Sequence, residues 1–261
     1  MNKLSFNIIK LSLFSIWTAD FASANYQKIQ AVLTNLERAA FNKTSPSALS
    51  KNSEIQETLR SIKNYGCWCY LDSNYVKAKG AVQDRLDQEC KQLVHGYKCL
   101  VIDGLDRGIN CDPLTQDYIE FDIFRGNNDI VEDCTRMNSK YLEVDDKNKQ
   151  QCAIDLCIVD GQFSMNLFGL VTSGSEFSVF DPMMSHDNYF ETETECKNEQ
   201  VENHRGAVSG GRSSCGRYPN RYLFKTMGGE RACCGDRTYN TVMMKCCNED
   251  RSIIQSVDSF C

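Results

Sequence analysis

The chain is short of residues that several protein classes need. Only three histidines and four prolines occur in 261 residues, and none of the 15 cysteines falls in the first 60 positions. Basic residues are in the minority, with 29 Lys and Arg against 35 Asp and Glu and a net charge of −6. The lack of a basic excess excludes a nucleic-acid binder that reads phosphates through a basic face. The low proline content excludes collagen-like and proline-rich linker sequence.

What the chain does contain is enough apolar material for a packed core. Apolar residues make up 41% of the sequence and aromatic residues 10%, which excludes a disordered chain. The fifteen cysteines leave three classes open: a metal protein, a redox enzyme or a disulfide scaffold.

The N-terminal sequence indicates which of these classes applies. Residues 1–24 have the features of a secretory signal peptide: Lys3 gives a positive start, residues 8–17 are mostly apolar, and residues 22–24 read Ala-Ser-Ala. Lys10 interrupts the apolar run, which is too short to span a bilayer, and we expect no transmembrane segment later in the chain. The sequence therefore predicts a secreted, extracellular protein.

An oxidising compartment favours disulfide bonds over free thiols. Because fifteen is odd, one cysteine is expected to be free or to pair between chains. Asn42 begins the sequon Asn-Lys-Thr, a candidate glycosylation site in the same compartment, with a chance match as the alternative.

Cysteine spacing and charge divide the mature chain. Residues 25–64 show helical spacing of apolar residues and form an N-terminal helical segment. Residues 65–200 hold nine cysteines, residues 201–214 look like a linker, and residues 215–261 hold six cysteines. The net charge is −10 over residues 25–200 and +3 over residues 201–261, which indicates two modules of opposite charge.

Three segments of the central module carry a family resemblance. Residues 65–69 read Tyr-Gly-Cys-Trp-Cys, residues 86–90 read Leu-Asp-Gln-Glu-Cys, and residues 152–160 read Cys-x4-Cys followed by Asp. Together they resemble the secreted phospholipase A2 family over roughly residues 60–196. The resemblance implies a mainly α, disulfide-rich fold with two long antiparallel helices behind N-terminal helices. It also implies the disulfides Cys67–Cys196 and Cys69–Cys90, and it leaves the other five cysteines of this module unassigned.

The family's reaction needs a histidine as general base, a following aspartate that binds calcium, and a second-helix aspartate that orients the histidine. Aligned without gaps, Val94 stands at the histidine position and His95 at the calcium aspartate. A shifted alignment makes His95 the base but puts Gly96 at the metal position. On a helix His95 lies roughly 170° from the apolar face. We therefore predict an exposed surface histidine.

Asp160 falls within the apolar face of the second helix. A carboxylate there is costly unless it is hydrogen-bonded. It is either a relic of the orienting aspartate or a structural anchor bonded to a tyrosine hydroxyl, and we favour the anchor because its histidine partner is missing.

The counterpart of the calcium loop is altered as well. Trp68, Tyr70 and Asp72 occupy the ligand region, but the glycines that would aim successive carbonyls inward are replaced. These three residues are weak calcium-ligand candidates, with a polar surface loop as the favoured alternative. His186 and Asp187 repeat the His-Asp pair, and we interpret them as a turn.

The C-terminal module contains the vicinal pairs Cys233-Cys234 and Cys246-Cys247, flanked by Cys215 and Cys261. This pattern resembles the galaxin-type di-cysteine module and implies matrix or coat material. Adjacent cysteines rarely bridge each other, so three bridges to separate partners are expected in a small β or irregular module. Short strands are expected around residues 222–226 and 238–241.

The favoured interpretation is a secreted, phospholipase A2-like protein without esterase activity that acts as a structural or binding component of extracellular matrix or coat material. Matrix proteins, glycans and phospholipids are its possible partners. The alternative is an active calcium-dependent phospholipase A2 that hydrolyses the sn-2 ester, with His95 as base and Asp160 orienting it. Calcium is needed only under that alternative.

Overall fold

The computed structural model describes residues 24–40, 61–71, 75–120, 129–141, 146–172, 180–186, 190–197 and 211–261. Several expectations fall outside these ranges: the signal peptide up to residue 23, the sequon at Asn42, the calcium-ligand candidate Asp72, and most of the linker.

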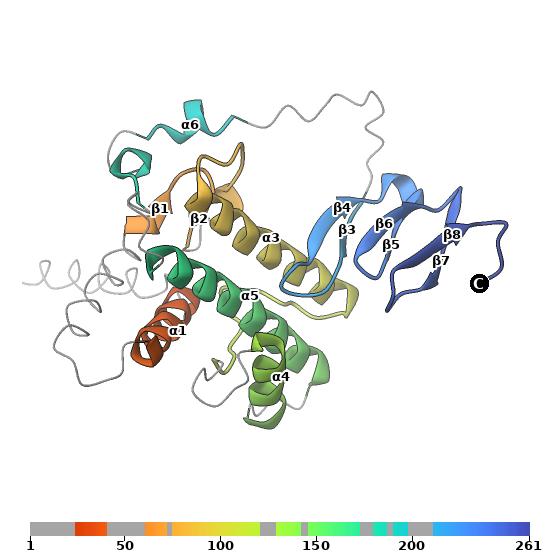
Figure 1. Ribbon diagram of the computed structural model, residues 1–261, viewed down its shortest axis with the longest axis horizontal. Helices are drawn as coiled ribbons and strands as arrows, with labels where there is room; N and C mark the ends of the chain where they lie inside the picture. The colour runs from red at the N-terminus through yellow and green to blue at the C-terminus, as the bar shows by residue number, and fades with distance from the viewer. Residues whose placement is uncertain are drawn as a thin grey trace, which may run out of the picture.

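The described chain has a helical core followed by small disulfide-stapled hairpins, as the sequence predicts (Figure 1). The helical part consists of α1 (Ala24–Ala40), α3 (Arg85–Asp106), α4 (Ile130–Tyr141), α5 (Lys147–Thr172) and the short α6 (Thr192–Glu195). Around them lie the two-residue strands β1 (Asn64–Tyr65) and β2 (Cys69–Tyr70) and the 3-10 turns η1 (Tyr75–Lys77) and η2 (Pro182–Met184).

Helix α3 begins where the sequence supplies a cap. The Asp84 side chain accepts a hydrogen bond from the backbone N–H of Asp87 at 2.8 Å, which satisfies one of the free donors at the helix start. Buried apolar residues then recur at helical spacing along one stripe. They are Leu86, Cys90, Leu93, Tyr97 and Leu100.

Helices α3 and α5 pack closely at Gly96. A Cβ atom on Gly96 would lie 2.7 Å from a methyl carbon of Val159, so only glycine allows this approach. The apolar face of α5 is buried against α1, α3 and α4. Its members are Cys152, Leu156, Val159, Phe163 and Leu167.

Helix α5 corrects one expectation. Residues 147–171 are long and apolar enough to cross a membrane, although we expected no later segment of that kind. About two-thirds of its apolar window (67%) is buried inside the protein, because three helices pack around it. Its hydrophobicity is that of a core helix, and length and composition alone are weak evidence for a membrane span.

Helix α1 packs on α5 through the predicted stripe, since Ile29, Val32 and Leu33 are all buried. From the second predicted stripe only Ile62 lies in the described residues, where it is buried.

Four disulfides fasten the helical core. Two of them, Cys67–Cys196 and Cys69–Cys90, are the pairs that the family resemblance implies. The structure assigns the remaining cysteines of this module as Cys111–Cys152 and Cys134–Cys157, with Cys99 left as a buried free thiol.

Three antiparallel hairpins form the C-terminal module. They pair β3 (Arg212–Cys215) with β4 (Tyr222–Lys225), β5 (Arg231–Cys234) with β6 (Arg237–Asn240), and β7 (Met244–Asn248) with β8 (Ile253–Ser256). Strands β4 and β6 lie where the sequence predicts them. The predicted linker is too long, because residues 212–214 belong to β3.

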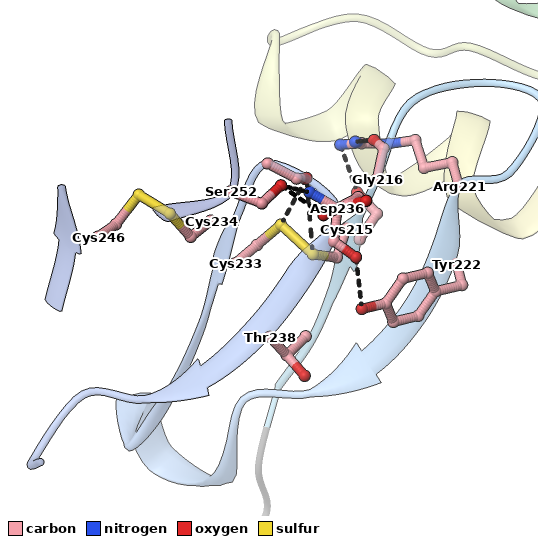
Figure 2. Close-up of a disulfide and its surroundings, with 12 residues drawn as sticks. Cys215, Gly216, Arg221, Tyr222, Cys233, Cys234, Asp236, Thr238, Cys246 and Ser252 are labelled. Carbon is pink, nitrogen blue, oxygen red and sulfur yellow. Dashed lines mark hydrogen bonds between the residues drawn. A yellow bond between two sulfur atoms is a disulfide. The ribbon is translucent and has the colours of Figure 1, made fainter. Parts of the chain in front are cut away.

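The vicinal cysteines join each hairpin to the next. Cys215 of β3 bridges Cys233 of β5, and Cys234 bridges Cys246 of β7 (Figure 2). Neighbouring side chains on a strand point to opposite faces, so one cysteine of a vicinal pair can bond to the preceding hairpin and the other to the following hairpin. A further bridge ties β7 to the C-terminal residue, Cys247–Cys261.

The first hairpin packs against α3. The carboxylate of Asp103 on α3 accepts hydrogen bonds from Arg221 at 2.5 and 2.8 Å, from the Tyr218 hydroxyl at 2.9 Å and from the Ser214 hydroxyl. Burial alone would raise the pKa of Asp103, but these donors and the charge of Arg221 hold it below its usual range. The helical and hairpin modules are therefore joined by a polar cluster as well as by the chain.

Candidate functional site

Asp160 is the centre of the candidate site, and it is completely buried on α5. Its two carboxylate oxygens accept hydrogen bonds from two tyrosine hydroxyls, Tyr97 on α3 at 2.6 Å and Tyr118 at 2.7 Å. Burial raises the pKa of Asp160, and although the two tyrosine hydrogen bonds partly offset this rise, the pKa is about 7. Asp160 therefore has the environment expected of a structural anchor, the interpretation that we favoured.

Tyr118 completes this cluster from a segment that sequence reasoning did not single out. It lies in an irregular segment after α3, and its pKa is raised far above the usual tyrosine value by burial and by the charge of Asp160. The nearby ammonium group of Lys28 lies 4.2 Å from the centre of the Tyr118 ring. Helical periodicity carries no signal for such a contact, because Tyr118 comes from an irregular segment.

The His95 side chain is not among the hydrogen-bond partners of Asp160. Its ring packs edge-on against the indole of Trp68, with the ring centres 5.3 Å apart. Burial, and to a smaller extent the charges of Lys98 and Lys91, lower the pKa of His95 to about 4. In the described part of the chain neither ring nitrogen makes a hydrogen bond.

The prediction that His95 is an exposed surface residue is therefore wrong in part. Trp68 of the loop before α3 covers the ring, so the residue is half-buried. Helical periodicity could not reveal this cover because it comes from another segment. Val94, which the resemblance would place at the position of the base, is buried with an exposed fraction of 1%.

The loop that resembles the calcium loop is held by protein groups. Asp87 is fully buried and accepts hydrogen bonds from the backbone N–H groups of Trp68 at 2.7 Å and Gln83 at 3.0 Å. Burial raises the pKa of Asp87, and these backbone donors oppose the rise. A side chain on Gly66, which has a φ of +56°, would collide with Asp87, with a contact of only 2.6 Å to the Cβ position. The loop thus wraps around a carboxylate.

The loop carbonyls already have hydrogen-bond partners. The Gly66 oxygen contacts the ring Nε2 of His186 at 2.6 Å, and the Trp68 oxygen accepts the backbone N–H of Tyr70 at 2.9 Å. The Cys67 oxygen likewise accepts the backbone N–H of Lys79 at 3.2 Å. No group of three or more His, Cys, Asp or Glu side chains that could hold a metal ion occurs among the described residues.

A large open cleft lies beside this loop but does not contain the candidate catalytic residues. It has a volume of about 880 Å³ and is bordered by Tyr70, His186 and Phe190. The His186 and Phe190 rings are stacked with their centres 5.8 Å apart. His186 lies in a turn, as predicted, whereas Asp187 is outside the described residues. Neither His95 nor Asp160 borders the cleft.

Comparison with known protein families, curated proteins and solved structures found no match to this chain. The seven disulfides, which engage all cysteines except Cys99, indicate an oxidising environment.

Proposed function

We propose that the chain is a secreted, non-catalytic protein with a phospholipase A2-like helical core and a galaxin-like hairpin module, serving as a structural or binding component of extracellular matrix or coat material. The observation that carries the proposal is the state of Asp160, whose carboxylate is closed into the core by two tyrosine hydroxyls.

Ester hydrolysis by the family's chemistry needs a general base that is held and oriented by the buried acid. Here Tyr97 and Tyr118 occupy both oxygens of Asp160, and the imidazole of His95 faces Trp68 instead. A base with a pKa near 4 is also a weak proton acceptor at neutral pH. Loss of a general base typically costs about 100- to 10,000-fold in rate.

The disulfide bonds of the protein support a structural role. The helical core carries four disulfides and the hairpins carry three, and each such bridge typically stabilises a fold by about 2–4 kcal/mol. The hairpins have little buried apolar surface apart from Cys215, Phe224 and Cys234, so their bridges hold the module together. Such a protein suits a long-lived extracellular material.

Hydrolysis of phosphatidylcholine by the purified full-length protein, with calcium and with chelator, tests the absence of catalysis. We expect no chelator-sensitive turnover, and the His95→Ala and Asp160→Asn variants should behave like the parent protein. Chelator-sensitive turnover that disappears in His95→Ala would restore the alternative of an active phospholipase A2.

The matrix role is tested separately by fractionating the material that the producing cells release. We expect the protein in the insoluble fraction, extractable only with denaturant and reductant. Recovery in the soluble fraction alone would contradict the matrix assignment.

A further inference from the structure

Basic side chains gather where α3 meets the first hairpin. Lys91 and Lys98 lie seven residues apart on α3, on either side of His95, and Arg212 opens β3 close enough to Lys98 to lower its pKa. Lys225 of β4 lies directly opposite Arg212 in the hairpin. We call these five residues, Lys91, His95, Lys98, Arg212 and Lys225, the basic ledge.

The pairing of Arg212 with Lys225 is unfavourable by itself. Residues directly opposite each other in an antiparallel pair share one face of the hairpin, and like charges in such positions repel. Both side chains are exposed. The hairpin thus keeps two cations side by side at its end nearest the linker.

Lys98 and Arg212 have no acidic partner among the described residues. Lys98 is half-buried, and both burial and the charge of Arg212 lower its pKa. This contrasts with Arg221 on the same hairpin, which pairs with Asp103, and with Arg217, which pairs with Asp250. Cations held together without an acid between them present a net positive field.

Trp68 fixes the shape of the ledge. The ammonium groups of Lys91 and Lys98 lie 5.0 and 5.5 Å from the centre of its indole ring, and His95 packs against the ring edge. The indole N–H donates to the Gly80 carbonyl at 3.1 Å, which holds the ring in place. The two lysines are therefore held in position by a rigid aromatic group. Because their side chains are already partly ordered, binding a ligand costs less conformational entropy.

We propose that the basic ledge binds a tetrahedral oxyanion, a sulfate or phosphate ester group, between Lys98 and Arg212 with Lys91, His95 and Lys225 around it. Ammonium and guanidinium groups form strong, charge-assisted hydrogen bonds with such oxygens. An anion there also relieves the repulsion between Arg212 and Lys225. This inference goes beyond the proposed function, because it holds whether or not the chain hydrolyses lipid.

Histidine NMR provides the test, since the His95 ring lies next to the proposed anion. The pKa of His95 in the free protein is about 4, and a bound anion within about 4–6 Å should raise it by about 1 or more. The titration is performed on the full-length protein with inorganic sulfate and with inorganic phosphate, at constant ionic strength set with chloride. The chemical shifts of His186 serve as an internal control and should not respond to either anion.

Two variants identify the groups that bind. Arg212→Gln removes an exposed cation with little risk to the fold, and Lys98→Gln removes its neighbour. Each should weaken sulfate binding about 10-fold, as expected for loss of one charge-assisted hydrogen bond. Lys149→Gln, which removes an exposed lysine at the start of α5, makes the same charge change away from the ledge and should bind sulfate like the parent protein.

The source of the ester is distinguished by two larger ligands. A sulfated oligosaccharide should shift the His95 resonance at lower concentration than inorganic sulfate, because several sulfates engage several cations. If the natural ligand is a lipid phosphate, phosphatidylglycerol vesicles rather than the oligosaccharide should shift the His95 resonance at low concentration. The proposal is overturned if no ligand changes the His95 pKa, or if Lys149→Gln weakens binding as much as Arg212→Gln.

Discussion

The hydroxyl group of Tyr97 on α3 donates a hydrogen bond to the carboxylate of Asp160 on α5, with 2.6 Å between the oxygens. This contact joins the two long helices through polar groups in the middle of an apolar interface. Tyr118 donates to the other carboxylate oxygen at 2.7 Å. A buried carboxylate with both oxygens satisfied by neutral donors has consequences for the stability of the fold.

The first prediction concerns pH. Burial raises the pKa of Asp160 from 3.8 to about 7 in the folded protein. Between these values the folded chain holds a proton at Asp160 that the unfolded chain has lost. The contribution of Asp160 to the free energy of unfolding is therefore complete below about pH 4 and declines as the pH rises to 7.

Urea unfolding with the disulfides intact, at several pH values between 4 and 8, measures this dependence. Asp160→Asn should flatten it because the amide does not titrate. Asp106→Asn, which removes an exposed carboxylate on α3, should retain the dependence of the parent protein. A parent protein and an Asp160→Asn variant with parallel pH profiles would contradict a raised pKa at this position.

The second prediction concerns the junction of the two modules. Arg221→Ala leaves Asp103 partly buried without its cation and should lower the free energy of unfolding by about 1–3 kcal/mol. Backbone amides of β3 and β4 should then exchange hydrogen faster than before. Arg217→Ala removes an exposed ion pair with Asp250 and should cost less than about 1 kcal/mol. Equal effects of the two variants would mean that the Asp103 cluster does not hold the hairpin.

The third prediction concerns the odd cysteine. Cys99 is buried on α3, and burial raises the pKa of its thiol to about 12. Because the thiolate is the reactive form, Cys99 should resist alkylation in the folded protein at pH 8. Unfolding without reductant should expose one thiol per chain, which mass spectrometry detects as a single added label. A disulfide-linked dimer on a non-reducing gel would show instead that Cys99 pairs between chains.

The fourth prediction concerns the closest approach of the long helices. Gly96→Ala places a methyl group against Val159 and should destabilise the fold by about 1–3 kcal/mol through overpacking. Gly169→Ala, in a part of α5 where an added methyl group meets nothing within 4 Å, should be neutral or stabilise by about 0.5–1 kcal/mol. Thermal unfolding of both variants measures the difference. A stable Gly96→Ala variant would mean that the two helices can separate without cost.

Local patterns were sufficient for much of the fold. The family resemblance implied the two long helices, and the vicinal cysteines predicted three bridges in the C-terminal module. On such a helix, apolar residues at helical spacing placed Asp160 on a buried face, where only a hydrogen-bonded carboxylate is tolerated. Each of these features depends on neighbours in the chain, which a sequence displays directly.

The partners of these residues were decided by tertiary structure. Tyr118 reaches Asp160 from an irregular segment, Trp68 covers a histidine that helical geometry assigns to solvent, and Arg221 meets Asp103 although 118 residues separate them. Such contacts depend on how separate elements pack, because burial is a property of all the atoms around a group rather than of its place on one helix. The sequence by itself thus determined which faces are apolar and where bridges can form. Packing alone decided that the acid on α5 is matched by tyrosines and that the imidazole on α3 is covered by Trp68.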